Sequence, residues 1–201
     1  MANDVDLFRR RILRGALAAG GLGFAAGHPD FGVAQELAAT PQCHDGDEPT
    51  LRQMDGPYFK PNSPERIELV EANTKGRLVE ITGQVLTRGC RAVPRALLDL
   101  WHADEFGEYD NRSFRYRGHL FTDGDGRYRF RTILPAVYTG RTRHYHMKVQ
   151  APGRPILTTQ LYFPDEPGNR RDFLFRPELL MRMAEVGDGL SARFDFVLDM
   201  R

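Results

Sequence analysis

The chain has 201 residues, of which 41% are hydrophobic, so it can bury one good core and is expected to form one domain with appendages. Its 28 basic and 27 acidic residues give a net charge of +1. A nearly neutral protein has no global electric field to attract nucleic acid or an anionic membrane, which disfavours both as partners.

The first 34 residues differ in composition from the rest of the chain. A basic run at residues 9–14 precedes a small, apolar run at residues 15–26 that is too short to span a bilayer. The order Arg-Arg-x-Ile-Leu-Arg resembles a twin-arginine export signal. We therefore expect residues 1–34 to be removed near Gln35, leaving residues 35–201 as an exported periplasmic or extracellular protein with no membrane anchor. A basic amphipathic helix is the alternative interpretation.

The chain has two cysteines, Cys43 and Cys90. In an oxidising compartment an even number of cysteines predicts a disulfide, with two unrelated buried thiols as the alternative. A bridge between them would close a loop of about 47 residues and stabilise the fold by about 4 kcal/mol or less.

The remaining residues are typical of an all-β protein. Residues 43–77 are extended and punctuated by proline, which predicts an irregular segment wrapping over the core. Short apolar runs bounded by glycine or proline predict strands at residues 78–85, 96–101, 127–133, 156–163 and 192–198. Only residues 176–185 suggest a helix. We expect an antiparallel β-sandwich core with an irregular N-terminal wrap and little helix, a barrel being the alternative.

The Asp-Gly-Asp-Gly sequence at residues 123–126 superficially resembles the start of a calcium loop. Position twelve of such a loop, which requires a bidentate glutamate, is Leu134. A tight β-turn is therefore the expected structure of this segment.

Two histidines mark the candidate site. The alternating pattern after Arg143 predicts a strand, which would project His144 and His146 from the same face, close enough to bind one metal ion. A hydrogen-bonded histidine pair without a metal is the alternative. Tyr109 follows a predicted strand and Tyr138 shortly precedes the histidines. Two phenolates and two neutral imidazoles form a donor set that suits Fe(III) better than Zn(II) or Mg(II), whereas each tyrosine alone would be interpreted as packing.

The same residues carry a resemblance to a known family. Ile-x-Gly-x-Val at residues 81–85, Leu-Asp-Leu at 98–100, Gly-x-Tyr at 107–109, Leu-Pro-x-x-Tyr at 134–138, Arg-x-x-His-x-His at 141–146 and Leu-Thr-Thr-Gln at 157–160 are similar to motifs of the intradiol ring-cleavage dioxygenases. This family includes catechol 1,2- and protocatechuate 3,4-dioxygenases. The resemblance covers roughly residues 55–170.

The resemblance implies one non-haem Fe(III) per chain, bound by Tyr109, Tyr138, His144 and His146. It implies that a catechol binds as a dianion, displaces Tyr138, and is cleaved by O2 between its two hydroxylated carbons to a cis,cis-muconate-type diacid. Arg141 would stabilise the developing negative charge.

Two further side chains would line the substrate pocket under this resemblance. Gln160 is placed there by its motif, and Tyr58 is an additional candidate, with packing beneath the loop as its alternative role.

Several features depart from the family pattern or leave alternatives open. Cys90 stands where the family commonly has glycine, which resembles an exported branch whose cysteine pairs near the mature N-terminus. The chain lacks the long N-terminal helical segment of intracellular dimeric members, so an oligomer is left open.

Two other functions are alternatives. His102, Asp104 and His144 imitate the ligand pattern of Fe(II)/2-oxoglutarate oxygenases, and an exported β-sandwich that only binds a ligand is the other alternative.

A carboxylated catechol would require a basic subsite. The candidate side chains for this subsite are Arg115, Arg117, Arg141 and Arg143.

Overall fold

The computed structural model describes residues 48–201. The export signal at residues 1–34, its cleavage near Gln35 and the predicted disulfide partner Cys43 lie outside the described residues and stay predictions. Cys90 lies in the turn after the first strand, with φ of 55°. Between residues 48 and 201, no helix is long and apolar enough to cross a membrane.

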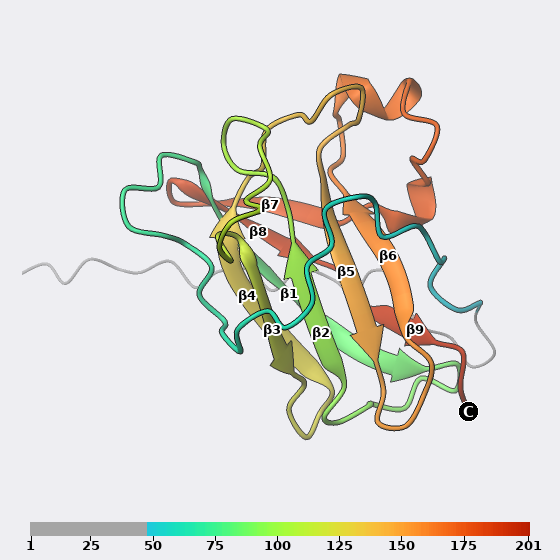
Figure 1. Ribbon diagram of the computed structural model, residues 1–201. Coiled ribbons are helices and arrows are strands. Elements are labelled where there is room, and N and C mark those ends of the chain that lie inside the picture. Colours follow the sequence, from blue (N-terminus) through green and yellow to red (C-terminus); the bar gives the residue numbers. More distant parts are fainter. Residues whose placement is uncertain (1–47) are drawn as a thin grey trace, which may run out of the picture. The chain divides into compact units, whose positions relative to one another are not determined.

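The described residues form two β-sheets with irregular connections, as Figure 1 shows, and the prediction of an all-β sandwich is confirmed. The first sheet has the order β3-β2-β5-β6 and the second β4-β1-β8-β7, with β9 also pairing with β1. The strands are β1 (Leu78–Thr87), β2 (Leu97–Trp101), β3 (Arg117–Phe121), β4 (Arg127–Ile133), β5 (His144–Gln150), β6 (Leu157–Tyr162), β7 (Arg182–Val186), β8 (Gly189–Arg193) and β9 (Phe196–Leu198).

The second sheet is mixed rather than purely antiparallel. Strand β1 pairs antiparallel with β4 but parallel with both β8 and β9, because the C-terminal segment returns to the sheet in the same direction as β1. The predicted strand at residues 192–198 is divided between β8 and β9.

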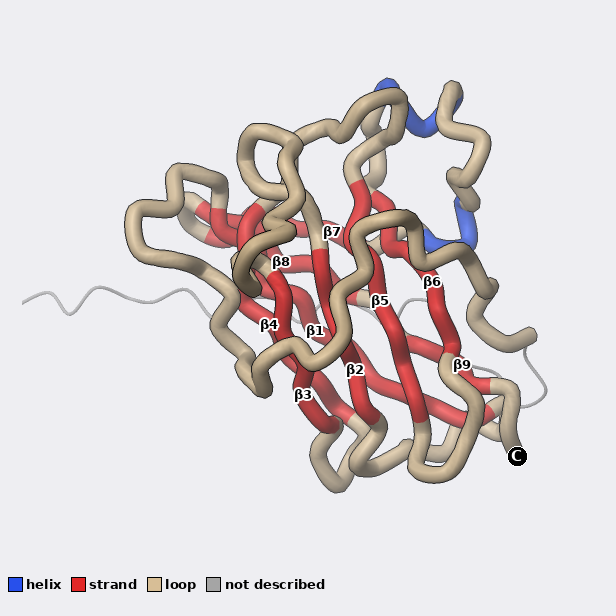
Figure 2. Tube along the Cα trace, in the orientation of Figure 1, coloured by secondary structure: helices blue, strands red, loops and turns tan. Residues whose placement is uncertain are grey.

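The predicted helix at residues 176–185 is wrong. The described residues contain only two short 3-10 helices, Pro167–Arg170 and Pro177–Leu179, drawn in blue in Figure 2. Strand β7 occupies the second half of the predicted helix, because residues 182–186 pair antiparallel with β8 in a tight hairpin. Inter-strand pairing therefore outweighs a modest local helical tendency.

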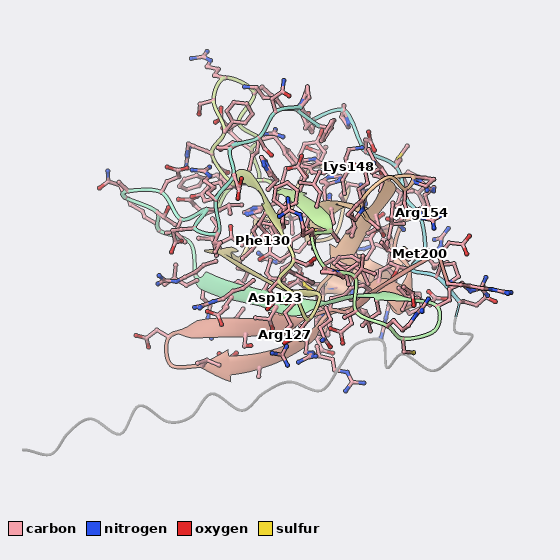
Figure 3. The ribbon with its side chains drawn as sticks, turned by 90° about the horizontal axis from the view of Figure 1, so that it is seen from below. Asp123, Arg127, Phe130, Lys148, Arg154 and Met200 are labelled. Atoms are coloured by element: carbon pink, nitrogen blue, oxygen red, sulfur yellow. The ribbon has the colours of Figure 1, made fainter. Side chains whose placement is uncertain are left out.

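The core lies between the two sheets and is built from alternate residues of the strands. In β1 every second side chain, from Val79 to Thr87, is buried, as expected for a strand with one face on the core. The predicted turn at residues 123–126 is present: the Gly126 N–H donates to the Asp123 carbonyl, and Asp123 and Arg127 flank this turn in Figure 3. The largest fully buried apolar side chains of the core include Phe130, Tyr145, Tyr162, Phe194, Phe196, Leu69, Ile81, Leu98 and Leu100.

The segment of residues 48–77, here called the wrap, crosses the outer face of the first sheet (Figure 1). It contacts β6 through Gln53 N and Thr158 O (2.7 Å), and β3 through Arg66 N and His119 O (2.9 Å). Strand β6 is consequently buried along its whole length and β5 along most of it. The predicted irregular wrap is confirmed for these residues, and it buries the face of β5 that carries the two histidines.

A glycine in β1 provides a test of this packing. A Cβ atom at Gly83 would overlap the Phe194 carbonyl oxygen and lie 2.8 Å from its carbonyl carbon. Because backbone cannot yield as a side chain does, we expect Gly83→Val to lower the free energy of unfolding by about 3 kcal/mol, measured by denaturant titration. Gly124→Ala is the control, since nothing lies within 4 Å of a Cβ there. Equal stability of the two variants would contradict this packing.

Candidate metal centre

The site forms where β5 begins, beneath the wrap. His144 and His146 point to the same side of β5 with their Nε2 atoms 3.2 Å apart. The Tyr109 hydroxyl lies 3.0 Å from His146 Nε2 and 3.4 Å from His144 Nε2. Three donor atoms from two distant segments therefore form a small triangle.

The dimensions of this triangle fit a metal ion. Two donors bound at about 2.1 Å to one ion stand about 3.0 Å apart at a right angle and about 3.4 Å apart at the tetrahedral angle. The observed separations of 3.0, 3.2 and 3.4 Å span this range. Within residues 48–201, no group of three or more His, Cys, Asp or Glu side chains could hold a metal, so the donor set depends on tyrosine.

The protonation of the histidines also fits a metal. His144 Nδ1 lies 2.7 Å from the Thr142 carbonyl oxygen, which requires a proton on Nδ1 and leaves Nε2 with a free lone pair. Burial, reinforced by the charge of Arg141, lowers the pKa of His144 to about 4, and burial holds the pKa of His146 well below its usual value. Both imidazoles are therefore neutral at pH 7, the form that binds metals.

His146 is held by packing. Its ring stacks on the Trp101 indole with centroids 4.8 Å apart and an interplanar angle of 6°. A Cβ atom at Gly56, in the wrap, would lie 3.3 Å from His146 Cε1, so the wrap backbone closes over the imidazole. His146 Nδ1 is buried without a hydrogen-bond partner among the described residues. The position of the His146 ring is thus set by Trp101 of β2 on one side and by the backbone of the wrap at Gly56 on the other.

Tyr109 is positioned by the loop after β2. The Asp104 carboxylate accepts hydrogen bonds from the Phe106 and Glu108 N–H groups, both at 2.9 Å, which folds residues 104–108 into a tight turn. The Ala136 N–H donates to the Asp104 carbonyl (2.9 Å) and joins this turn to the loop that carries Tyr138. Burial raises the pKa of Tyr109, so a bound cation would be needed to ionise this phenol.

Tyr138 reaches the site but not the triangle. Its ring centroid lies 5.5 Å from that of Tyr109, and its hydroxyl is hydrogen-bonded to the Tyr58 hydroxyl at 2.8 Å. The Tyr58 ring in turn stacks on Tyr109 with centroids 4.5 Å apart. The hydrogen bond with Tyr58 raises the pKa of Tyr138. Tyr58 therefore contacts both predicted tyrosine ligands, rather than packing beneath the loop away from them.

Arg141 and Gln160 lie next to each other beside the histidines. Gln160 is paired with His146 across β5 and β6, and its side-chain oxygen accepts a 2.6 Å hydrogen bond from Arg141 Nη2. Arg143 instead contacts the Pro135 carbonyl (2.6 Å) and Glu166 (2.8 Å), so Arg141 is the arginine of this segment that contacts Gln160.

One residue of the site was missed from the sequence. The Asp172 carboxylate, whose side chain is fully buried, accepts hydrogen bonds from Arg141 Nε and from the backbone N–H groups of Thr142 and Leu174. It lies 31 residues from Arg141 in a loop without a recognisable motif, so no local signal marks it.

The residues that imitate the Fe(II)/2-oxoglutarate pattern, His102, Asp104 and His144, do not form one ligand set. His102 is buried with Nε2 on Thr132 (2.6 Å) and Nδ1 on the Ala103 carbonyl (2.7 Å), while the Asp104 carboxylate caps its own turn. In the described part of the chain these residues do not form a metal-binding group with His144. The interpretation as an Fe(II)/2-oxoglutarate site is therefore wrong.

Comparison with known proteins agrees with this geometry. A family model described as Dioxygenase matches residues 54–200. Its span includes every donor of the triangle. The chain belongs to the intradiol dioxygenase family.

Individual members of this dioxygenase family are similar to the chain. Catechol 1,2-dioxygenase 2 of Acinetobacter lwoffii is 29% identical, covering 68% of this chain and 61% of the relative, and the protocatechuate 3,4-dioxygenase beta chain of Burkholderia cepacia is 31% identical over 61% and 65%. The chain thus spans less than two thirds of the length of these relatives.

Among solved structures, the dioxygenase domain of a dioxygenase carbohydrate-binding protein fusion from Streptomyces sp. SirexAA-E is 53% identical, with a TM-score of 0.75. The match covers 77% of this chain and 100% of that domain.

Proposed function

We propose that this protein is an intradiol dioxygenase that cleaves a catechol ring with O2 to a cis,cis-muconate-type diacid. The observation that carries the proposal is the triangle of Tyr109 Oη, His144 Nε2 and His146 Nε2, with Arg141 adjacent, in a chain of this family. Non-haem Fe(III), one per chain, is the proposed cofactor, and these three residues together with Tyr138 would hold it.

Fe(III), when bound, would accept charge from a catecholate and so make the ring reactive toward O2 without an external reductant. The chain supplies three further elements. Neutral imidazoles and phenols give a compact donor set, the wrap covers the His146 ring, and Arg141 would place positive charge beside the reacting ring. Tyr138, if released as a phenolate when a catechol binds, would accept one of the protons that the catechol loses, and the Tyr58 hydroxyl is placed to hydrogen-bond to it.

The first test is the visible absorption spectrum of the purified, iron-loaded protein before and after anaerobic addition of catechol. We expect a broad tyrosinate-to-iron band that shifts to longer wavelength with catechol. On admission of labelled O2, mass spectrometry should find both oxygen atoms in the diacid. A protein that stays colourless with ferric iron and consumes no O2 with any catechol would contradict the proposal and favour a ligand-binding module.

Replacement of Tyr138 tests whether this residue, whose hydroxyl lies outside the triangle, is needed for iron binding or for turnover. Because its hydroxyl is bonded to Tyr58 and not to the triangle, we expect Tyr138→Phe to retain most of the iron. Turnover of catechol should nevertheless fall by about 100-fold, since a group that accepts a substrate proton is lost. Metal analysis and steady-state kinetics measure the two effects. Loss of iron as complete as in Tyr109→Phe would show that Tyr138 is a permanent ligand.

Export through the signal at residues 1–34, with a Cys43–Cys90 disulfide in the mature protein, remains part of the proposal. It is supported by the sequence alone.

A further inference from the structure

The arginines nearest the centre already have partners. Arg141 Nε lies 2.8 and 3.0 Å from the two oxygens of Asp172, and its Nη2 donates to Gln160. Arg143 Nε lies 2.8 Å from Glu166, and its Nη1 donates to the Pro135 carbonyl. Each guanidinium is therefore already paired with a carboxylate of the protein, which reduces the free energy gained by pairing with a second carboxylate on a substrate ring.

Arg117, the third candidate cation, is buried and bonded to backbone carbonyls. Arg117 is only 1% exposed, so its guanidinium is enclosed by protein. Its Nη1 donates to the Tyr58 carbonyl (2.6 Å) and its Nε to the Asp110 carbonyl (3.1 Å). Arg117 therefore joins the wrap to the Tyr109 loop through backbone carbonyls.

The fourth candidate, Arg115, lies in acidic surroundings. It lines a cavity of about 490 Å³ beside Tyr109 and lies 4.0 Å from Glu105. The ionisable side chains lining this cavity, apart from tyrosines, are three carboxylates and two guanidiniums, namely Asp104, Glu108, Asp110, Arg112 and Arg115. An anionic ring substituent would meet excess negative charge there.

The loops around the site instead expose large apolar side chains. Met54, Phe106, Val137 and Phe173 are 54%, 72%, 53% and 76% exposed. We call these four residues the apolar rim. Such side chains gain free energy when a ligand covers them.

Each member of the apolar rim lies in a segment whose backbone neighbours a residue of the site. The Met54 carbonyl accepts a hydrogen bond from Gln160, and a Cβ at Gly107, beside Phe106, would contact the Val137 carbonyl. Val137 precedes Tyr138, and Phe173 follows Asp172. Phe106, Val137 and Phe173 belong to the loops after β2, β4 and β6, which Figure 1 shows at the same end of the sandwich, and Met54 belongs to the wrap.

We propose that the site selects catechols that carry an uncharged, apolar ring substituent and discriminates against a ring carboxylate. This inference rests on the proposed function and specifies its substrate class. A carboxylate entering this site would lose its hydration and would meet arginines that are already paired or enclosed by protein, whereas an apolar group would be covered by the apolar rim.

The test compares two probes substituted at the same ring position, 4-tert-butylcatechol and protocatechuate, with catechol as reference. For the iron-loaded protein we expect kcat/KM and the anaerobic dissociation constant, measured by calorimetry, to favour 4-tert-butylcatechol over protocatechuate by about 10-fold to 100-fold. Equal or better binding and turnover of protocatechuate would overturn the inference while leaving the proposed function intact. Absence of turnover with all three probes would instead overturn the proposed function.

Serine replacements in the apolar rim test whether these side chains cause the preference for an apolar ring substituent. Phe173→Ser, and separately Val137→Ser, should lower kcat/KM for 4-tert-butylcatechol relative to catechol by about threefold to tenfold. Ile156→Ser is the matched control, because Ile156 is 41% exposed but lies in the β5–β6 turn, at the opposite end of β5 from His144. We expect no change in the control. An unchanged ratio in both rim variants, or the same change in Ile156→Ser, would show that the apolar rim does not select the substituent.

Discussion

Tyr109→Phe is expected to abolish most iron binding and to reduce catechol turnover by more than about 100-fold. The hydroxyl that it removes is the only oxygen of the triangle and lies 3.0 and 3.4 Å from the two imidazole nitrogens. Two neutral imidazoles alone would leave a trivalent cation without an anionic donor in a buried site. Metal analysis after gel filtration, together with the visible spectrum, measures the loss.

Tyr145→Phe is the matched control for this replacement. Tyr145 lies on β5 between the two histidines but projects into the core, where its hydroxyl donates to the Ile133 carbonyl at 2.8 Å. Its loss should cost about 1 kcal/mol of stability without loss of iron. If Tyr109→Phe bound iron as the wild type does, or if both variants lost it equally, Tyr109 would not be a ligand.

Asp172→Asn is expected to reduce kcat by about 10-fold to 100-fold with a smaller effect on KM. The carboxylate accepts hydrogen bonds from Arg141 Nε, Thr142 N–H and Leu174 N–H. Thr142 in turn presents the carbonyl that holds His144 Nδ1. An amide nitrogen cannot accept hydrogen bonds, so the replacement releases Arg141 and disturbs the peptide that orients His144, a proposed metal ligand.

The Asp172→Asn experiment must separate loss of the position of Arg141 from a general loss of folding stability. Iron content, the absorption band and the kcat-to-KM split are recorded on folded protein at a temperature well below unfolding. Glu185→Gln is the control, because Glu185 also pairs with an arginine, Arg77, but its side chain is 70% exposed, and an exposed pair contributes little. A wild-type kcat in Asp172→Asn would exclude a role in positioning Arg141.

Much of the fold was predictable from periodicity. Strands β1, β2, β4 and β6 fall within two residues of the predicted ranges, because alternating apolar residues bounded by glycine or proline specify a strand locally. Strand β3 was not predicted: Arg117 opens it and is buried, so the segment lacks an ordinary apolar pattern. Strand β7 was predicted as helix, since the pairing with β8 that stabilises it is not a property of the segment itself.

The sequence by itself predicted the identities of the candidate donors. The i, i+2 spacing of His144 and His146 defines a shared strand face, and the motif spacing selects Tyr109 and Arg141. Only the tertiary structure decided how these residues are held. Gly56 meets His146 and Asp172 meets Arg141 through contacts between segments far apart in the chain, which depend on the path of the wrap and of the loop after β6. Such contacts leave no local pattern, because nothing in the composition of either segment requires its partner.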